Sequence, residues 1–225
     1  MKTYAIIPSG GDSKRFGGEI PKQYVKINGK EIIVYTIELF QNCEMIDEII
    51  IAAKKEYFGL LYDLKQKYNL NKISNIIEGG KERQDSVYKA LSSLTADTED
   101  LIAVHDAARP LLSNKILAKA LNEAKISDSI VVAIKARDTL IKGNMFVEEY
   151  VDRNNIYYAQ TPQIFKYKIL SDSMNKAYNE NFIGTDESMI VKKAGYTVKI
   201  IEGDLKNFKI TNSSDIDLFK SILSN

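Results

Sequence analysis

The sequence predicts an α/β fold in which helices cover a doubly wound, mostly parallel sheet. Short β-branched runs alternate along the chain with stretches of helical periodicity, a pattern typical of parallel sheets. The chain has 225 residues, of which 44% are hydrophobic and 27% charged, as in an ordinary globular protein. A chain of this length can bury a substantial core, and we expect residues 1–225 to form a single domain.

The individual elements follow from apolar runs and their spacing. We expect strands at residues 4–8, 49–53, 73–77, 101–105, 130–134 and 198–201, and helices at 32–40, 57–68 and 113–124. A further helix follows the third strand, because Val87, Ala90, Leu91 and Leu94 lie on one helical face. Ligands of such sheets bind beyond the carboxyl ends of the strands. The polar clusters after residues 8, 78 and 104 are therefore the candidate site.

One segment departs from this alternation. Residues 135–154 contain two extended halves on either side of Gly143 and Asn144, a plausible hairpin turn. Few of these residues can reach a core, and a protruding hairpin usually needs a partner. We expect a β-hairpin dimerisation arm; a floppy surface hairpin is the alternative.

Composition excludes several classes of protein. Basic and acidic residues nearly cancel, 31 against 30, which does not favour wholesale binding to nucleic acid or anionic membranes. Cys43 and His105 are the only residues of their types, so an intrachain disulfide and a multi-His or Cys-rich metal centre are excluded. The longest apolar runs are too short for a signal peptide or a membrane span, which predicts a cytoplasmic protein.

The first polar cluster directly follows the first strand. Its glycines allow a polyphosphate to approach the backbone, and Lys14, Arg15 and Lys22 add positive charge. Fixed cations accelerate phosphoryl transfer because the transferring group gains negative charge. The sequence matches neither a Walker A loop nor G-x-G-x-x-G, which disfavours an ATPase or a simple dehydrogenase. A solvated turn with incidental charges is the alternative.

The second and third clusters also precede helices. Gly79 and Gly80 begin a segment whose backbone can read a base edge or bind an anion. Taken by itself, the cluster is explained better by a helix cap at Asp85 or Ser86. In the third cluster, Asp106 ends a central strand, a common place to hold Mg²⁺ or a ribose hydroxyl.

Arg109 follows Asp106 by three residues. It can bind a phosphate in bidentate fashion, or it can form a structural pair with Asp106. His105 is interpreted as a structural histidine at the strand end, because phosphate oxygens are already ionised at neutral pH and need no general base.

The clusters occur in a characteristic order with several shorter motifs. From Ile7 to Thr211 the chain contains SGGDSKRF, PKQ, EGG-x-x-R-x-x-S, VHDAARP, RDT, VDR, QTPQ-x-F, TDE and N-x-K-I-T. This order resembles the 2-C-methyl-D-erythritol 4-phosphate cytidylyltransferase family. The resemblance implies a Rossmann-like domain and a homodimer joined by hairpin arms. It further implies Mg²⁺ or another divalent cation, and transfer of CMP from CTP to methylerythritol phosphate, with release of pyrophosphate, in non-mevalonate isoprenoid synthesis.

The resemblance also assigns four catalytic residues. Arg15 and Lys22 would stabilise the pentavalent α-phosphorus of CTP. Arg153 and Lys209 would hold the attacking methylerythritol phosphate. Because Thr139 and Arg153 lie on the arm, these two residues would serve the site of the partner subunit.

Further contacts follow from the same resemblance. Asp106 would lie between nucleotide, metal and substrate. Gly80 and Ser86 would face the cytosine and ribose, and Arg109 and Thr161 would shape the substrate side. The remaining expected nucleotide contacts are Pro8, Ser9, Gly10, Gly11, Lys14 and Ala107.

The opening loop departs from the family pattern A-A-G-x-G-x-R. Ser13 stands where a glycine is usual, and a left-handed backbone there would cost a serine roughly 1–2 kcal/mol. Asp12 adds a negative charge near the expected triphosphate. Both changes can lower the affinity for the nucleotide, but the expected catalytic cations are retained, so we expect an active enzyme.

Three other functions are compatible with parts of this pattern. A ribitol 5-phosphate or other alditol phosphate cytidylyltransferase has a similar fold and loop, but its motifs favour HDAVRP and TDAC, whereas this chain has HDAARP and TDES. A non-catalytic nucleotide-binding scaffold is a different class, which the retained cations argue against. A nicotinamide dehydrogenase is the most distant alternative.

Overall fold

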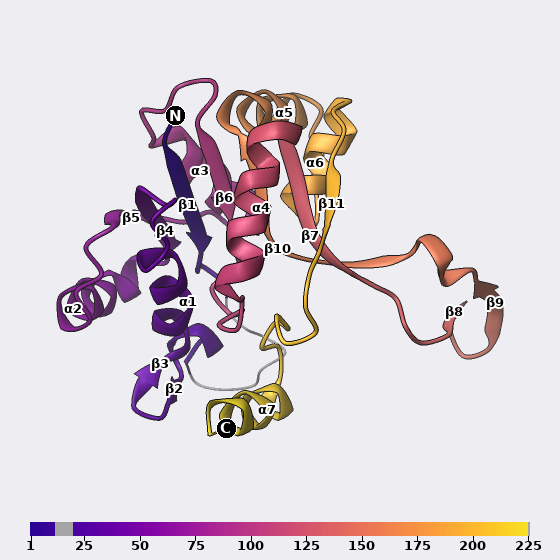
Figure 1. Ribbon diagram of the computed structural model, residues 1–225, viewed down its shortest axis with the longest axis horizontal. Coiled ribbons are helices and arrows are strands. Elements are labelled where there is room, and N and C mark those ends of the chain that lie inside the picture. Colours follow the sequence, from indigo (N-terminus) through magenta and orange to yellow (C-terminus); the bar gives the residue numbers. More distant parts are fainter. Residues whose placement is uncertain (12–19, 225) are drawn as a thin grey trace.

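A seven-stranded sheet forms the centre of the protein, with helices on both faces (Figure 1). The computed structural model describes residues 1–11 and 20–224. Across the sheet the strand order is β11-β7-β10-β6-β1-β4-β5. The strands are β1 (Thr3–Pro8), β4 (Glu48–Ala53), β5 (Ile73–Glu78), β6 (Leu101–Val104), β7 (Ser129–Lys135), β10 (Tyr157–Lys166) and β11 (Lys199–Glu202). All six expected strands are present.

Most neighbouring strands run parallel. β1 pairs in parallel with β4 and β6, β4 with β5, and β11 with β7. The expected mostly parallel α/β sheet is therefore confirmed. Its three central strands are β10, β6 and β1, so the candidate site residues after β1 and β6 lie at the middle of the sheet.

β10 is antiparallel to both β6 and β7, and the sequence pattern does not predict it. Pro162 interrupts the strand pattern, since a proline cannot donate a ladder hydrogen bond and usually argues against a central strand. Here the Thr161–Pro162 peptide is cis, and the pairing with β7 shifts register between Ala159 and Gln163. Pro162 lies within this interruption of the ladder, and the neighbouring Thr161 Oγ1 accepts from the Asp106 amide.

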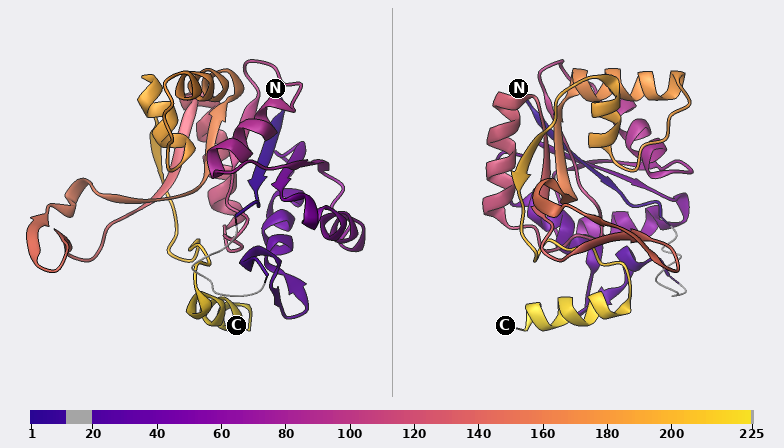
Figure 2. Two further views of the ribbon diagram at one scale, coloured as in Figure 1. Left: turned by 180° about the vertical axis from the view of Figure 1, so that it is seen from behind. Right: turned by 90° about the vertical axis from the view of Figure 1, so that its right-hand side faces the viewer.

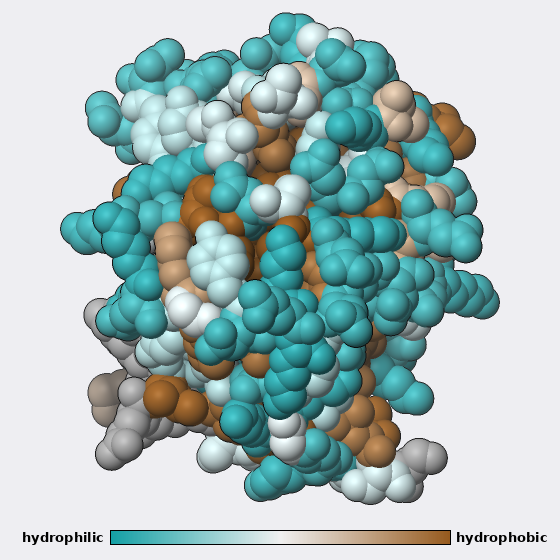
Figure 3. Space-filling view, turned by 90° about the vertical axis from the view of Figure 1, so that its left-hand side faces the viewer, coloured by the Kyte–Doolittle hydropathy of each residue, from teal (hydrophilic) through white to brown (hydrophobic). Residues whose placement is uncertain are grey.

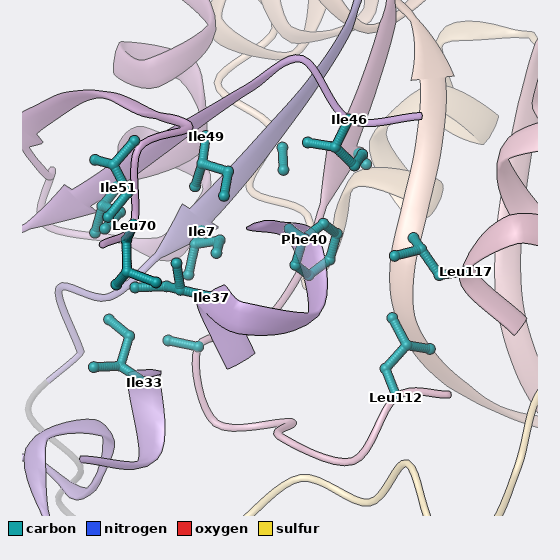
Figure 4. Close-up of a cluster of buried hydrophobic side chains, with 14 of the residues drawn as sticks. Ile7, Ile33, Ile37, Phe40, Ile46, Ile49, Ile51, Leu70, Leu112 and Leu117 are labelled. Carbon is teal, nitrogen blue, oxygen red and sulfur yellow. The ribbon is translucent and has the colours of Figure 1, made fainter. Parts of the chain in front are cut away.

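Each face of the sheet carries its own layer of helices, as the turned views in Figure 2 show. One layer packs α1 (Ile32–Gln41), α2 (Phe58–Lys67) and α4 (Asn114–Ser127) against the sheet. The other packs α3 (Arg83–Ser92), α5 (Tyr167–Asn179) and α6 (Glu187–Ala194). Figure 4 shows how Ile7 and Ile49 from the strands meet Ile37 and Phe40 from α1. Apolar residues on both strand faces thus fix the sheet between two cores.

Smaller elements complete the end of the molecule where the site lies. They are η1 (Lys22–Tyr24), β2 (Lys26–Ile27), β3 (Lys30–Glu31), η2 (Lys55–Tyr57) and α7 (Ser213–Leu223). Ile27, Ile210 and Phe219 belong to a third apolar cluster, which attaches α7 to the β2–β3 hairpin. The face that carries α2 and β5 is mainly hydrophilic (Figure 3). Among the described helices, none combines the length and apolarity needed to cross a bilayer.

A long hairpin projects from the domain (Figure 1). It comprises β8 (Leu140–Gly143) and β9 (Val147–Val151), which pair antiparallel, followed by η3 (Arg153–Asn155). The expected extended halves around residue 143 are therefore present, although β7 continues to Lys135 before the arm begins. Met145 and Phe146 at the tip are more than four-fifths exposed. A two-stranded hairpin of this kind is marginally stable when it lacks a covering surface.

Candidate active site

A pocket of about 280 Å³ lies beyond the carboxyl ends of β1 and β6. This is where the topology of a doubly wound sheet places ligands. The pocket is lined by Pro8, Ser9, Gly10, Gly11, Lys22, Gln23, Gly80, Lys81, Glu82, Arg83, Ser86, Asp106, Ala107, Ala108, Lys209 and Thr211. All three polar clusters predicted from the sequence therefore meet here.

Side chains of η1 form hydrogen bonds with Ser9 and Gly11, at the start of the glycine-rich loop that follows β1. The Gln23 amide donates to the carbonyls of Ser9 (2.8 Å) and Gly11 (3.2 Å). Ser9 Oγ and Tyr24 Oη are 2.8 Å apart, and the Tyr24 ring stacks on Tyr57. Burial raises the pKa of Tyr24 to about 12, so it remains a neutral partner. These contacts fix the first residues of the loop beside Lys22.

The turn at Gly79 and Gly80 packs tightly against the start of α3. A Cβ atom on Gly80 would lie 2.1 Å from Asp85 Cβ, so only glycine fits. The Gly80 amide donates to Ser86 Oγ (3.0 Å), and that hydroxyl donates to the Glu82 carbonyl (3.2 Å). Glu82, rather than Asp85 or Ser86, is the N-cap residue, while Asp85 accepts from the Glu82 amide in a capping box. The turn and its cap form one rigid unit.

Asp106 stands at the centre of the charged groups. Its carboxylate accepts from Arg83 Nε (3.1 Å) on Oδ1, and from Arg109 Nε (3.3 Å) and Lys209 Nζ (3.0 Å) on Oδ2. The residue is 7% exposed. Burial disfavours its charged form, but the charges of Arg83, Lys209 and Arg109 prevail and hold the pKa of Asp106 well below its usual range. The carboxylate is therefore ionised at neutral pH.

A second buried carboxylate balances part of this positive charge. Both oxygens of Glu187 accept from Arg83 Nη1, at 2.6 and 2.7 Å, and Glu187 is fully buried. Burial alone would lower the pKa of Arg83, but the charges of Glu187 and Asp106 raise it. Burial raises the pKa of Glu187, although the charge of Arg83 opposes this effect. With both carboxylates ionised, the three cations leave this wall of the pocket with one excess positive charge, which suits an anionic ligand.

The backbone of Asp106 is positioned by its neighbours in the sheet. The Asp106 amide donates to Thr161 Oγ1 (3.1 Å), which lies 3.0 Å from His105 Nδ1. His105 Nε2 lies 3.0 Å from the Arg109 carbonyl, an obligatory acceptor. These partners assign the neutral tautomer with the proton on Nε2, so that Thr161 donates to Nδ1. Complete burial lowers the pKa of His105 to about 4, consistent with the structural role expected for this histidine.

The segment that carries Lys209 is attached to the same strand. The buried side-chain amide of Asn207 donates to the Thr161 carbonyl (2.8 Å), and the backbone carbonyl of Asn207 accepts from Arg109 Nη1 (2.8 Å). The Ile210 amide then donates to the Ala108 carbonyl (2.9 Å). Lys209 is therefore held beside Asp106 by contacts on both sides of it in the chain.

The structure brings together most of the predicted site residues. Ten of them line the pocket: Pro8, Ser9, Gly10, Gly11, Lys22, Gly80, Ser86, Asp106, Ala107 and Lys209. Arg109 and Thr161 lie behind this surface and contact Asp106. Thr139 and Arg153 are exposed on the arm, where Arg153 Nη1 donates to the Arg137 carbonyl. Asp12, Ser13, Lys14 and Arg15 lie outside the described residues.

Gln23, Arg83 and Glu187 are site residues to which the sequence pattern assigns no role. All three occur within quoted motifs, PKQ, EGG-x-x-R and TDE, which is the only signal that could have identified them. Arg83 and Glu187 are 104 residues apart, and their contact requires the folded sheet.

Glycine-rich turns beside a positively charged pocket at the ends of parallel strands define a nucleotide-binding α/β protein, and comparison with known proteins places it among the nucleotidyltransferases. The chain belongs to the 2-C-methyl-D-erythritol 4-phosphate cytidylyltransferase family, whose model matches residues 3–225.

Relatives and solved structures agree with this membership. A protein of this name from Clostridium perfringens is 40% identical over 222 residues, which cover 96% of each chain. One from Syntrophus aciditrophicus is 33% identical over 225 residues, 99% of this chain and 96% of the relative. The Francisella tularensis cytidylyltransferase structure superposes with a TM-score of 0.85 at 31% identity and covers 98% of this chain and 99% of its own.

The buried histidine predicts a specific pH dependence of stability. The folded pKa of about 4 lies below the unfolded value of 6.5, so the unfolded chain binds an extra proton between these pH values. This contribution to stability is complete above pH 6.5 and is lost as the pH falls toward 4, by about 3 kcal/mol in all. Urea unfolding of the wild type and His105→Gln across this range should show a shallower dependence in the variant. Equal slopes would contradict a neutral His105.

Proposed function

We propose that this chain transfers CMP from CTP to the phosphate of 2-C-methyl-D-erythritol 4-phosphate and releases pyrophosphate. Its family and relatives are cytidylyltransferases named for this acceptor. The observation that carries the proposal is the ionised Asp106, surrounded by three cations between the glycine turns and the Lys209 segment. The ribitol 5-phosphate alternative is not favoured, because relatives over nearly the whole chain carry the methylerythritol name.

The proposed reaction needs positioning and fixed charge more than proton transfer. A phosphate oxygen of the acceptor attacks the α-phosphorus of CTP, and the bond to the leaving pyrophosphate breaks. The attacking oxygen is already ionised, which fits a site whose histidine is buried and neutral. Lys22 lines the pocket beside the glycine loop, where its charge would stabilise the pentavalent α-phosphorus. Arg15 is proposed for the same role.

The nucleotide would occupy the side of the pocket formed by the two glycine-rich segments. The Gly80 turn and Ser86 would face the cytosine and ribose, since their backbone and hydroxyl groups lie at the pocket surface. The triphosphate would lie along Ser9, Gly10 and Gly11, where the backbone can approach closely. Pro8, Lys14 and Ala107 are proposed as further contacts.

The acceptor would bind on the side of Asp106 and Lys209. Lys209 Nζ contacts Asp106 and lines the pocket, so it can exchange this contact for the acceptor phosphate. Arg109 and Thr161 would act through Asp106, which they hold from behind. Such placement keeps one phosphate oxygen in line with the α-phosphorus.

A divalent cation, Mg²⁺, is proposed as the cofactor. Within the described residues, no three His, Cys, Asp or Glu side chains converge on a common metal site. The pocket offers Asp106 as its buried carboxylate. This donor set fits Mg²⁺, which is commonly bound through one or two carboxylates together with substrate phosphates. Asp106 would be the protein ligand, and the bound ion would neutralise charge on the triphosphate.

We also propose a homodimer that forms through the arms. The exposed Met145, Phe146 and Tyr150 give the hairpin an apolar surface that a partner subunit would cover. Thr139 and Arg153 project with this arm away from their own pocket, and they would complete the site of the partner (Figure 1). Both proposed substrates are highly charged metabolites that do not cross membranes unaided, so we place the reaction in the cytoplasm.

The substrate proposal is tested by pyrophosphate release. CTP is incubated with methylerythritol, ribitol or glycerol phosphate in parallel, and ATP replaces CTP as a control. We expect rapid release only with CTP and methylerythritol phosphate, because the backbone of the Gly80 turn is proposed to read the pyrimidine edge. Faster turnover of ribitol phosphate would support the alditol alternative, and no release with any acceptor would support a scaffold.

The role of Lys209 is tested by its replacement with alanine. We expect Lys209→Ala to raise KM for the acceptor and to lower kcat/KM for it by roughly tenfold or more, with the KM for CTP within about twofold. Lys206→Ala, at an exposed position of the same segment, is the control. Steady-state kinetics in which each substrate is varied separately measure both values. An unchanged acceptor KM and kcat would remove Lys209 from the site.

Shared sites are tested by mixing two inactive variants. Lys22→Ala damages a subunit's own pocket, whereas Arg153→Ala damages the pocket of its partner. In a hybrid dimer both lesions fall in one site and the other site is intact, so mixing should restore at most about a quarter of wild-type activity. Mixing each variant with itself is the control. A fully active monomer, or no recovery in proven hybrids, would contradict the arrangement.

A further inference from the structure

We propose that the buried Arg83–Glu187 pair is a positioning device that orients Asp106 for the acceptor and keeps Arg83 away from the phosphates. The proposal rests on the proposed function, because it assigns Asp106 to the acceptor half of the reaction. Arg83 lines the pocket and carries a positive charge, so a phosphate ligand is the obvious alternative role. Its contacts point to a different one.

The guanidinium of Arg83 is committed to two carboxylates. Nε donates to Asp106 Oδ1 (3.1 Å), and Nη1 donates to both oxygens of Glu187 (2.6 and 2.7 Å). Nη2 is buried and has no hydrogen-bond partner among the described residues. A fork of this shape can bridge two anions at fixed spacing, whereas the point charge of a lysine cannot. A phosphate could recruit Arg83 only by breaking these contacts.

Glu187 is itself fixed in place by the surrounding backbone. It is the first residue of α6, where the helix dipole favours a carboxylate. The preceding loop is fastened to α3 through Gln84, whose amide donates to the Phe182 carbonyl (3.1 Å) and accepts from the Gly184 amide (2.8 Å). Gln163 of β10 accepts from the Ser188 amide (2.7 Å). Glu187 is therefore a rigid anchor rather than a mobile counterion.

The fixed position of Glu187 is important because Lys209 is proposed to contact two anions, the Asp106 carboxylate and the acceptor phosphate. Without acceptor, Lys209 Nζ contacts Asp106 at 3.0 Å, but in the proposed reaction it turns to the acceptor phosphate. Arg83 and Arg109 then remain to compensate and orient the Asp106 carboxylate. Glu187 holds Arg83 in this position against the attraction of the triphosphate. The pair thus separates the cations that bind substrate from those that hold Asp106.

The test replaces the pair as a unit. Arg83→Met/Glu187→Met removes both charges together and keeps similar side-chain lengths, a change that buried ion pairs often tolerate without loss of stability. We expect the melting temperature to stay within a few degrees of wild type. We expect kcat/KM for the acceptor to fall about tenfold or more, because small misplacements of reacting groups are costly. Calorimetric CTP affinity, measured without added Mg²⁺ so that a metal on Asp106 does not contribute, should stay within about threefold. Lys168→Met/Asp172→Met, which removes an exposed ion pair of α5, should change neither value.

Arg83→Lys provides a second variant with the charge retained. We expect it to lose acceptor kcat/KM in the same way, since a lysine cannot bridge both carboxylates. Arg83→Lys also tests the role of the Arg83–Glu187 pair if the double variant does not fold. Acceptor kcat/KM within twofold of wild type would make the pair merely structural and overturn the proposal. A loss of CTP affinity equal to the loss of acceptor kcat/KM would make Arg83 a nucleotide ligand and overturn it as well. A wild type that releases no pyrophosphate would instead contradict the proposed function.

Discussion

The carboxylate of Asp106 is buried and ionised, and most of the site is arranged to satisfy that combination. An unpaired carboxylate in this position would gain a proton, because burial disfavours its charge. Arg83, Arg109 and Lys209 prevent this, and they come from the start of α3, the loop after β6 and the segment before α7. No two neighbouring elements could provide these contacts alone. The charged centre therefore depends on contacts between segments that are far apart in the chain.

The antiparallel strand β10 connects these contributions. Lying between β6 and β7, it reaches both halves of the sheet. Thr161 accepts from the Asp106 amide on one side, while its carbonyl accepts from Asn207 on the other. Two positions further on, Gln163 holds the start of α6. A strand with a cis proline at its centre thus positions the acidic residue, the Lys209 segment and Glu187 together.

The sequence predicted the parallel part of the fold well, because buried parallel strands appear as short apolar runs between helical patterns. All six predicted strands are present, and the extended halves of the arm pair as expected. β10 was not predicted, since Pro162 interrupts its pattern and the cis peptide that accommodates it leaves no signal in a single sequence. Ten predicted site residues line one pocket, because motifs at strand ends converge wherever the strands are parallel.

The residues that the sequence could not assign are those that act through other residues. Arg83 and Glu187 lie 104 positions apart, and neither has a neighbour in the chain that indicates the partner. Gln23 is similar, since its amide serves two carbonyls of a loop rather than a ligand. A motif marks a residue type and a position, but it does not distinguish a residue that contacts the substrate from one that positions such a residue. Only the side-chain contacts in the folded structure make that distinction.

The charges of Asp106, Arg83 and His105 are also insensitive to pH near neutrality. The pKa of Asp106 lies well below its usual range, that of Arg83 is raised, and that of His105 is lowered to about 4. None of these groups changes its charge between pH 6 and 8, so the field they create is fixed before the substrates arrive. Fixed charges of this kind stabilise a transition state without reorganising during the reaction. For two anionic substrates that carry their own ionised nucleophile, such a field replaces the titrating general base that many other transferases need.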